Sequence, residues 1–481
     1  MPEHAVALPE HVSLRACEHL LRPDRQEDLC FALYRTSTGS HRRTALVYDL
    51  VLPETGDREV HGNAAFDSRF IRRALRRAEA ENAGLAFMHS HPLGRGWQDM
   101  STDDTAAELG HAAVVHSVSG LPFLGLTVAS EGRWSARLWM RSENGQYERA
   151  DCSRVRVVGE ALVTTYHPSI PVGPTRAQIR TVNFWGEDKH REFTGLRVGI
   201  VGLGSVGSIV AQSLARIGVV QLTLIDHDIV KLHNLDRTLG ATEADATANR
   251  PKVLVAARES ARGATSVTFK AEKVIASVVE ETGFRAALDC DVLFSCVDRP
   301  WARHVLNAIA YSHLIPVIDG GILVRFHERT GAFLGADWAV RTAGPGRRCL
   351  LCSGAYDLAN VSLEQTGLLE DSSYIAGLPE SSPLKRRENI LPLSLGVASF
   401  EVLQLVAMVS GLMGLRDLHE QRYSYYPGVV RVEERENCEE RCPFVDLVSA
   451  GDAAPKVTGL DRSVDASKRR SKRTRATNVE P

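Results

Sequence analysis

Apolar and polar residues in the first third of the chain follow two different periods. Five short runs rich in apolar and β-branched residues predict strands; they cover residues 29–34, 44–52, 85–88, 121–128 and 134–140. Between the second and third runs, apolar residues recur at helical spacing from Phe70 to Ala78, after a capping Asp67 and before Gly84. Because the mixed order contains no strand–helix–strand repeat, residues 1–155 are predicted to form an α+β domain.

The rest of the chain has a different pattern. Residues 176–450 begin with helical spacing and then alternate apolar strands with helices, which predicts an α/β domain with a Rossmann-like sheet. Residues 156–175 contain three prolines and are predicted to form a linker. The apolar stretch 398–415 includes Glu401, Gln404 and two glycines, which predicts a buried helix instead of a bilayer span. Residues 451–481 have little apolar content and a basic run at 468–475, so a disordered tail is predicted.

Composition is typical of a chain with two or three globular domains. The 481 residues are 44% hydrophobic and 24% charged with a net charge of −2, so no strong field implies a membrane or a specific nucleic-acid partner. The N-terminus has no basic segment followed by an apolar one, which favours a cytoplasmic protein. Nine cysteines in a chain of this size favour free thiols and metal ligands over disulfides.

Two histidines and an aspartate form a candidate metal site in the first domain. His89 and His91 end the predicted strand at 85–88, and residues i and i+2 of a strand point to the same face. Ser101 and Asp104 open the next element, a predicted helix. Two imidazoles and one carboxylate can hold a catalytic Zn²⁺ and leave its fourth position open. The plainer alternative is that Ser101 and Asp104 are a helix capping pair beside a surface pair of histidines.

This pattern resembles the JAMM (MPN/Mov34) metalloprotease motif, H-x-H followed by S-x-x-D. Members cut peptide or isopeptide bonds at the C-terminus of ubiquitin-like proteins, so the resemblance implies a JAB/MPN fold and that activity. It also implies that Glu27 is the base that takes a proton from water and that Ser101 donates to the oxyanion. One departure is the nine residues between His91 and Ser101, where about seven are expected. We expect the extra residues, Gly96–Gln98, to form a loop over the metal.

A candidate nucleotide site opens the second domain. The apolar strand 197–201 leads into Gly202, Gly204 and Gly207, and a helix follows. This GxGxxG pattern lets phosphates approach backbone NH groups at a helix N-terminus. The next apolar strand ends in Asp226, whose carboxylate is placed to bind a ribose hydroxyl. At this point an NAD-dependent dehydrogenase fits equally well.

Five polar residues that follow separate these possibilities: Asp228, Asn234, Arg237, Lys252 and Asp298. From about residue 195 to 320 the series resembles the ubiquitin-activating (E1-like) superfamily that includes ThiF and MoeB. The resemblance implies that Asp226 and Asp228 bind the nucleotide and that Asp298 binds Mg²⁺. It also implies that Asn234 contacts the ATP phosphates, together with the catalytic pair Arg237 and Lys252. A dehydrogenase does not need Arg237, Lys252 and Asp298 together, although each of them alone could be a solvated surface charge.

Four late cysteines form two close pairs, Cys349 with Cys352 and Cys438 with Cys442. Such pairs suit a tetrahedral structural Zn²⁺, and members of the superfamily often carry one; the alternative is four buried thiols. No cysteine lies between the pairs, where thioester-forming members often keep a catalytic one. Cys290 and Cys296 are predicted to be buried small apolar residues. We therefore expect the acyl-adenylate to pass directly to a nucleophile, with a serine-loop hydroxyl as the alternative: Ser372, Ser373, Ser381 or Ser382.

Together the two resemblances predict two opposed chemistries on one partner. The second domain would adenylate the C-terminal glycine of a ubiquitin-like protein with Mg²⁺ and ATP, and the first would cleave the bond next to that glycine. An E2-like protein and a homodimer are among the partners that the resemblance implies. A second hypothesis is the activation and trimming of a sulfur carrier for cofactor biosynthesis. A third, a binding scaffold with inactive sites, disagrees with the intact ligand and phosphate-binding residues.

Overall fold

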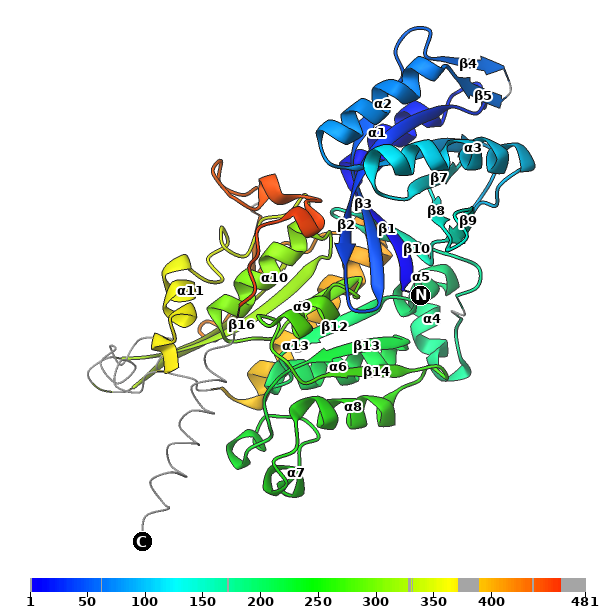
Figure 1. Cartoon of the computed structure of the whole chain (residues 1–481). Helices are drawn as coiled ribbons and strands as arrows, with labels where there is room; N and C mark the ends of the chain where they lie inside the picture. The colour runs from blue at the N-terminus through cyan, green and yellow to red at the C-terminus, as the bar shows by residue number, and fades with distance from the viewer. Residues whose placement is uncertain are drawn as a thin grey trace. The chain divides into compact units, whose positions relative to one another are not determined.

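The chain forms two compact units in the computed structural model (Figure 1). Described residues are 2–459 except 62, 171–172, 328–329, 331, 371–388 and 435–436. Unit 1 contains residues 1–173 together with 311–314 and 445–454. Unit 2 contains residues 174–310 and 315–444 and the chain from 455 onward.

Unit 1 is built on a mixed nine-stranded sheet with the order β11-β10-β1-β3-β2-β6-β7-β8-β9. Its strands are β1 (Glu3–Pro9), β2 (Leu29–Thr38), β3 (Arg42–Val51), β6 (Gly84–His91), β7 (Phe123–Ala129), β8 (Trp134–Arg141), β9 (Tyr147–Asp151), β10 (Arg154–Val158) and β11 (Leu162–Tyr166). Its helices are α1 (Glu10–Leu20), α2 (Ser68–Ala80) and α3 (Thr102–Ser119), and β4 (Arg58–His61) pairs with β5 (Asn63–Phe66). Helix α2 begins at the predicted cap, where Asp67 accepts a hydrogen bond from the Arg69 amide at 2.8 Å.

The two faces of this sheet carry separate hydrophobic cores because side chains alternate along each strand. On β6, Ala86 and Met88 belong to the core that includes α1 residues. Leu85 and Phe87 belong to the other core, with residues of α2 and α3. The same alternation puts His89 and His91 on the face that carries α2 and α3.

Unit 1 extends past the domain boundary expected at residue 155. Strand β10 runs from Arg154 to Val158 and pairs in parallel with β1, and β11 pairs with β10. The first half of the segment expected to be a linker therefore contributes two strands to the sheet. Segment 445–454, which includes the first residues of the predicted tail, also belongs to unit 1. Further along, in unit 2, the Gly459 amide donates to the Val279 carbonyl. The basic run 468–475 lies outside the described residues.

Unit 2 contains an eight-stranded sheet with the order β14-β13-β12-β15-β16-β17-β18-β19. Its strands are β12 (Arg197–Val201), β13 (Gln221–Ile225), β14 (Lys270–Val274), β15 (Val292–Ser295), β16 (Val317–Phe326), β17 (Phe333–Ala343), β18 (Glu420–Ser424) and β19 (Val429–Glu433). The first five strands in the order are parallel and the last three are antiparallel. This arrangement confirms the α/β Rossmann-like fold predicted for the second domain. Strand order reverses at β12 and β15, where such sheets open a ligand crevice at their carboxyl ends.

The helices of unit 2 connect these strands. They are α4 (Ile179–Trp185), α5 (Glu187–Thr194), α6 (Ser205–Ile217), α7 (Glu243–Thr247), α8 (Lys252–Gly263), α9 (Glu281–Ala287), α10 (Pro300–Ser312), α11 (Leu358–Gln365) and α13 (Leu391–Ser410). Helix α13 is long and apolar enough to cross a membrane, but 67% of its most apolar window is buried inside the protein. It packs against α6, β16 and β17, as expected for a core helix.

Candidate functional sites

The structure brings His89, His91 and Asp104 together in unit 1. Their ligand atoms all lie within 4.8 Å of one another. The Nε2 atoms of His91 and His89 lie 3.5 and 3.8 Å from the Asp104 carboxylate. Two ligands of one tetrahedral Zn²⁺ lie about 3.4 Å apart. The spacing of these ligand atoms therefore fits a metal ion. His89 Nδ1 is also buried without a hydrogen-bond partner among the described residues.

Burial and mutual contacts set the charge states of these three ligands. Burial, with the nearby Arg137, lowers the pKa of His89 to about 3, so its imidazole is neutral, as a metal ligand must be. A hydrogen bond to Asp104 raises the pKa of His91 despite its burial. The same bond holds the pKa of Asp104 well below its usual range. A cation bound here would therefore take the place of the proton that His91 shares with Asp104, and it would find His89 already neutral.

Ser101 and Glu27 lie beside this cluster. Ser101 is the N-cap of α3, where its hydroxyl donates to Asp104 at 2.7 Å and accepts from the Asp104 amide at 3.1 Å. The capping alternative is thus present in the structure, next to the metal-ligand candidates. Glu27 precedes β2, and burial raises its pKa while the charges of His91 and Asp104 act on it. A half-buried carboxyl with a raised pKa is suited to exchanging a proton with water.

The residues between β6 and α3 form a loop, as expected. The Gly94 amide donates to the His91 carbonyl at 2.9 Å, and the Gly96 amide donates to Glu131 at 2.5 Å. Gln98 hydrogen-bonds to His91 and adds to the rise in its pKa. The additional residues therefore reach back to the ligand cluster.

Sequence reasoning missed a buried polar network behind His89. Thr127 Oγ1 lies 3.3 Å from His89 Nε2 and accepts from Arg137 at 2.5 Å. Arg137 is paired with the fully buried Glu108, which also accepts from the Trp139 indole at 2.7 Å. The available signal was Arg137 itself, a charge inside an otherwise apolar strand, which is buried only when it is paired.

The glycine loop of unit 2 has the predicted strand–turn–helix form. Gly202 has a φ of +88°, and a Cβ there would lie 2.5 Å from the Cys296 carbonyl. A Cβ on Gly207 would lie 1.9 Å from the Gly202 carbonyl. Gly204 caps α6 and has open space where its Cβ would be. Only glycine fits at Gly202 and Gly207, and the open space at Gly204 leaves room for a phosphate at the helix N-terminus.

Three carboxylates surround Lys252 at this edge of the sheet. Its Nζ donates to Asp228 at 2.8 Å. Burial alone would lower the pKa of Lys252, but the charges of Asp226, Asp228 and Asp298 raise it overall. Asp226 accepts from the Leu203 amide at 2.6 Å, which ties the carboxylate to the glycine loop, and burial raises its pKa. Glycine loop, lysine and acids therefore form one polar site.

Asn234 and Arg237 lie in the turn between β13 and α7, and their side chains bond within that turn. Asn234 accepts from the Lys231 amide at 3.0 Å, and Arg237 donates to the His233 carbonyl at 2.7 Å. Arg237 also pairs with Asp236 at 2.8 Å. The recorded side-chain contacts do not join these two residues to Lys252.

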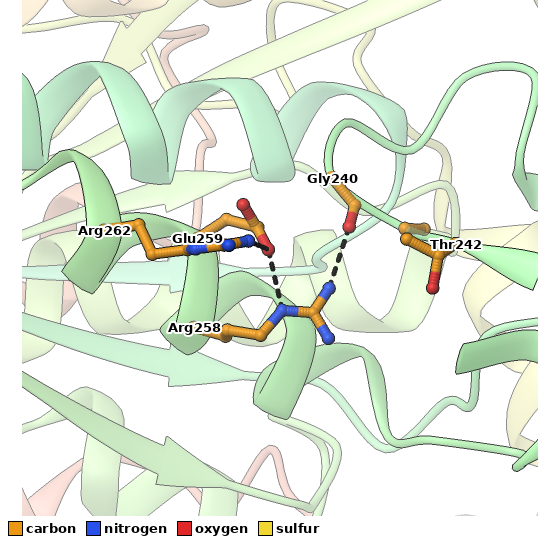
Figure 2. Close-up of a pocket in the computed structure, with 6 residues that line it drawn as sticks. Gly240, Thr242, Arg258, Glu259 and Arg262 are labelled. Carbon is orange, nitrogen blue, oxygen red and sulfur yellow. Dashed lines mark hydrogen bonds and ion pairs between the residues drawn. The ribbon is translucent and has the colours of Figure 1, made fainter. Parts of the chain in front are cut away.

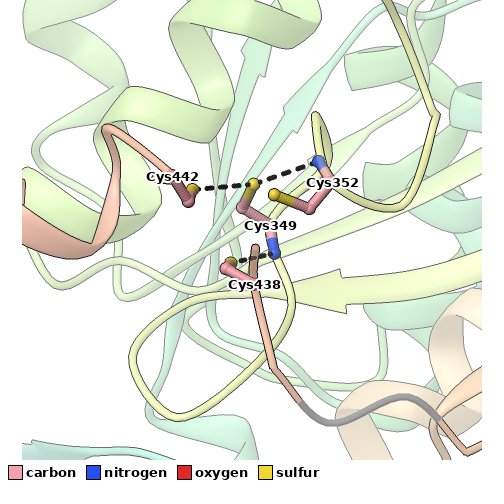
Figure 3. A group of neighbouring side chains, drawn as sticks. All are labelled: Cys349, Cys352, Cys438 and Cys442. Carbon is pink, nitrogen blue, oxygen red and sulfur yellow. Dashed lines mark hydrogen bonds between the residues drawn. The ribbon is translucent and has the colours of Figure 1, made fainter. Parts of the chain in front are cut away.

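The four late cysteines converge from two distant segments (Figure 3). All four sulfur atoms lie within 4.8 Å of one another, with Cys349 and Cys442 Sγ at 3.6 Å. The Cys349 amide donates to Cys438 Sγ at 3.2 Å. Hydrogen bonds, the one from Cys349 first, lower the pKa of Cys438 to about 5. Four neighbouring sulfur atoms, one of them stabilised as a thiolate, fit a tetrahedral site for a metal ion such as Zn²⁺.

Two further cysteines lie close to β12 and the glycine loop. Cys290 is fully buried, and the Cys296 thiol lies 3.8 Å from the buried Glu401 on α13. Burial, with the charge of Glu401, raises the pKa of Cys296 well above its usual range. Neither thiol is placed as a nucleophile. The serine alternative (Ser372, Ser373, Ser381 and Ser382) lies outside the described residues.

A shallow pocket of about 680 Å³ lies beside α8 (Figure 2). Its lining is Gly240, Ala241, Thr242, Arg258, Glu259 and Arg262. Arg258 donates to the Gly240 carbonyl at 2.9 Å and pairs with Asp245 at 2.8 Å, so it braces the turn. None of the predicted ATP-binding residues lines this pocket.

Comparison with known proteins gives a match for the second unit. The sequence model of the ThiF family matches residues 175–436. Molybdopterin-synthase adenylyltransferase of Salmonella typhimurium is 34% identical over 182 residues, which are 36% of this chain and 64% of that protein. Ubiquitin-like modifier-activating enzyme 5 of Drosophila mojavensis is 30% identical over 135 residues, which are 26% of this chain and 33% of that protein. The chain thus spans less than two thirds of these relatives.

Among solved structures, E. coli MccB with ATP is 15% identical, with a TM-score of 0.43. The match covers 56% of this chain and 74% of that one.

Proposed function

This chain belongs to the ThiF family, and we propose that unit 2 uses ATP to adenylate the C-terminal carboxylate of a small carrier protein. The observation that carries the proposal is the group formed by the glycine loop, Lys252 and three carboxylates at the reversal of strand order. The glycine loop accepts phosphates, Asp226 binds the ribose, and Lys252 balances phosphate charge.

In the proposed reaction, a carboxylate oxygen of the carrier attacks the α-phosphorus of ATP. The bond from that phosphorus to the bridging oxygen breaks, and pyrophosphate leaves. Lys252 exchanges Asp228 for phosphate oxygens, and Arg237 leaves its turn to do the same. Mg²⁺, held by Asp298, would supply further neutralisation of phosphate charge. Asn234 supports the phosphates from the adjoining turn.

The chemical class of the carrier is suggested by the relatives. One is named for molybdopterin synthase and another for a ubiquitin-like modifier. We propose a ubiquitin-like protein with a C-terminal glycine as the partner of this chain, with an E2-like protein receiving the activated carboxyl group. A sulfur carrier for cofactor biosynthesis is the second candidate. The unit is proposed to act as a homodimer in the cytoplasm.

For unit 1 we propose zinc-dependent cleavage of the peptide or isopeptide bond next to the same glycine. His89, His91 and Asp104 would hold the Zn²⁺, which when bound lowers the pKa of water and polarises a carbonyl. Glu27 takes the proton of the attacking water and returns it to the leaving amine. Ser101 would turn its hydroxyl proton from Asp104 to the developing oxyanion. Carrying both activities on one chain raises the effective concentration of the shared partner.

The test is a pair of assays on the full chain with a partner recovered by pull-down. ATP–pyrophosphate exchange should depend on the partner and stop when its last glycine is removed. A fusion extended beyond that glycine should be cleaved, and zinc analysis should give two ions per chain. Asp104→Ala should lose one zinc and cleavage, yet keep exchange. NADH oxidation without any exchange would disprove adenylation, and cleavage by Asp104→Ala would disprove the assigned ligand set.

A further inference from the structure

A pocket of about 440 Å³ lies beside the histidine cluster, within unit 1. It is lined by the end of α1, the loop after β6 and the turn after β7, and its residues are Leu21, Arg22, Arg25, Pro92, Leu93, Arg95 and Ser130. Three of its lining residues are arginines, and the Glu131 carboxylate accepts a hydrogen bond from the lining Ser130 at 3.3 Å. We call it the arginine pocket.

The arginines differ in how far they are neutralised. Arg22 forms two hydrogen bonds with Asp24, at 2.6 and 3.0 Å, and is already paired. Arg25 and Arg95 are exposed, and the described structure records no side-chain partner for either. Two guanidinium groups are therefore available to an anion, and guanidinium pairs suit the two oxygens of a carboxylate.

The backbone supports a ligand-binding role for Arg25. Its φ is +59°, in the left-handed region that L-residues other than asparagine and aspartate rarely adopt. The turn is closed by a 3.1 Å hydrogen bond from the Arg25 amide to the Arg22 carbonyl. Strained conformations of this kind tend to occur at ligand sites. Leu93 adds an apolar wall, since 79% of its surface is exposed.

The pocket adjoins the proposed reaction site on two sides. Arg25 is two residues before Glu27, and Pro92 directly follows His91. Two residues of chain span at most about 7 Å, so the backbone of Arg25 lies within that distance of the backbone of Glu27. An extended substrate covers the same distance in two or three residues. A pocket so close to the cleaved bond can contact a side chain of the protein substrate, whereas binding of a free anion would not depend on that closeness.

We propose that the arginine pocket binds an acidic side chain of the protein substrate, within three residues of the bond that unit 1 cleaves. This specificity rests on the proposed cleavage function. The carboxylate pairs with Arg25 and Arg95, and its aliphatic part contacts Leu93. Substrates with alanine or lysine at that place bind and react more weakly.

The first arm of the test measures cleavage by the full chain. Its probes are internally quenched peptides centred on Gly-Gly, with Glu, Ala or Lys placed at each of three positions on either side. At one position, the Glu peptide should have a kcat/KM about tenfold higher than the Ala peptide, and the Lys peptide should have a lower kcat/KM than either. Arg25→Gly suits the positive φ yet removes the guanidinium, so it should lose about fivefold of the preference, as should Arg95→Ala. The exposed Arg76→Ala on α2 is the matched control and should change nothing.

The second arm measures binding without cleavage, by fluorescence anisotropy of the same labelled peptides with full-length Glu27→Gln. Binding that prefers Glu and loses this preference in the arginine variants supports the pocket even if no peptide is cleaved. In that case only the proposed cleavage fails. Cleavage without any acidic preference, or binding equal for Glu, Ala and Lys peptides, overturns the pocket and leaves cleavage intact. Competition by inorganic phosphate with no preference among the peptides also overturns it, because the site would then be a simple anion site.

Discussion

The Nζ of Lys252 lies 2.8 Å from the Asp228 carboxylate, beside the glycine loop. A lysine held by acids in the free protein is already charged and oriented when a polyphosphate arrives. Asp226 hydrogen-bonds to the loop itself, so the same group of acids sets both the loop and the lysine. In the proposed reaction, ATP phosphates would replace Asp228 as the partner of a lysine that is already charged and oriented.

Lys252→Ala should therefore lower partner-dependent ATP–pyrophosphate exchange by about 100-fold or more, the size of effect seen when one electrostatic donor is removed from a reacting centre. Cleavage by unit 1 should be unchanged. Lys273→Ala, an exposed lysine on β14, is the matched control. Exchange within twofold of the wild type in Lys252→Ala would contradict the assignment.

Glu27→Gln should keep both zinc ions and lose cleavage by about 100-fold or more, because the amide is close in size to the carboxyl but cannot take a proton. Zinc content and cleavage of a ubiquitin-like fusion should be measured on the same samples. Glu79→Gln, on the exposed side of α2, serves as the control. A variant that cleaves at the wild-type rate would remove Glu27 from the role of base.

Features set within one element, such as a helix cap or the face of a strand, were easier to predict than the extent of unit 1. His89 and His91 share a face because alternation along a strand is a local property, and Asp67 caps α2 through its own backbone neighbours. Strand β10 could not be foreseen in the same way, because its place depends on pairing with β1, about 150 residues earlier. The return of segment 445–454 to unit 1 is equally non-local.

Polar networks show the same limit. The motif gave His89 and Asp104, but the partners of Arg137 come from α3 and β7, which only the fold brings together. The sequence signal for such a network is weak because a charge inside a strand indicates that a partner exists without naming it. The GxGxxG pattern is stronger, since Gly202 and Gly207 each have a backbone carbonyl where a Cβ would lie.

Replacing Cys290 and Cys296 together by alanine should leave adenylate formation and onward transfer nearly unchanged. Cys290 is buried, and the raised pKa of Cys296 keeps its thiol protonated. The loss of one fully buried thiol and one partly buried thiol should lower the free energy of unfolding by about 1–3 kcal/mol. Gel analysis of the wild type with its partner should show no thiol-labile adduct. A trapped intermediate should be released by hydroxylamine only, and a thiol-labile adduct lost in the variant would identify a catalytic cysteine.

Glu401 is fully buried on α13, between the Cys296 thiol and the charge of Asp319. Burial is the main cause that raises the pKa of Glu401 well above its usual value of about 4.3, and the charge of Asp319 adds to the rise. Below that value the carboxyl is protonated in the folded and the unfolded chain alike. Above it the unfolded chain releases the proton while the folded chain keeps it, so stability falls with rising pH by up to about 1.4 kcal/mol per pH unit. That loss continues until pH reaches the folded pKa.

Glu401→Gln should remove this dependence, because the amide resembles the protonated carboxyl in shape and has no proton to release. Relative to the wild type, the variant should therefore gain stability in unit 2 between pH 5 and pH 8. The measurement is calorimetric unfolding of the full chain at both pH values, with the exposed Glu243→Gln on α7 as the control. A constant difference between Glu401→Gln and wild type across this range would show that Glu401 does not hold a proton in the folded protein.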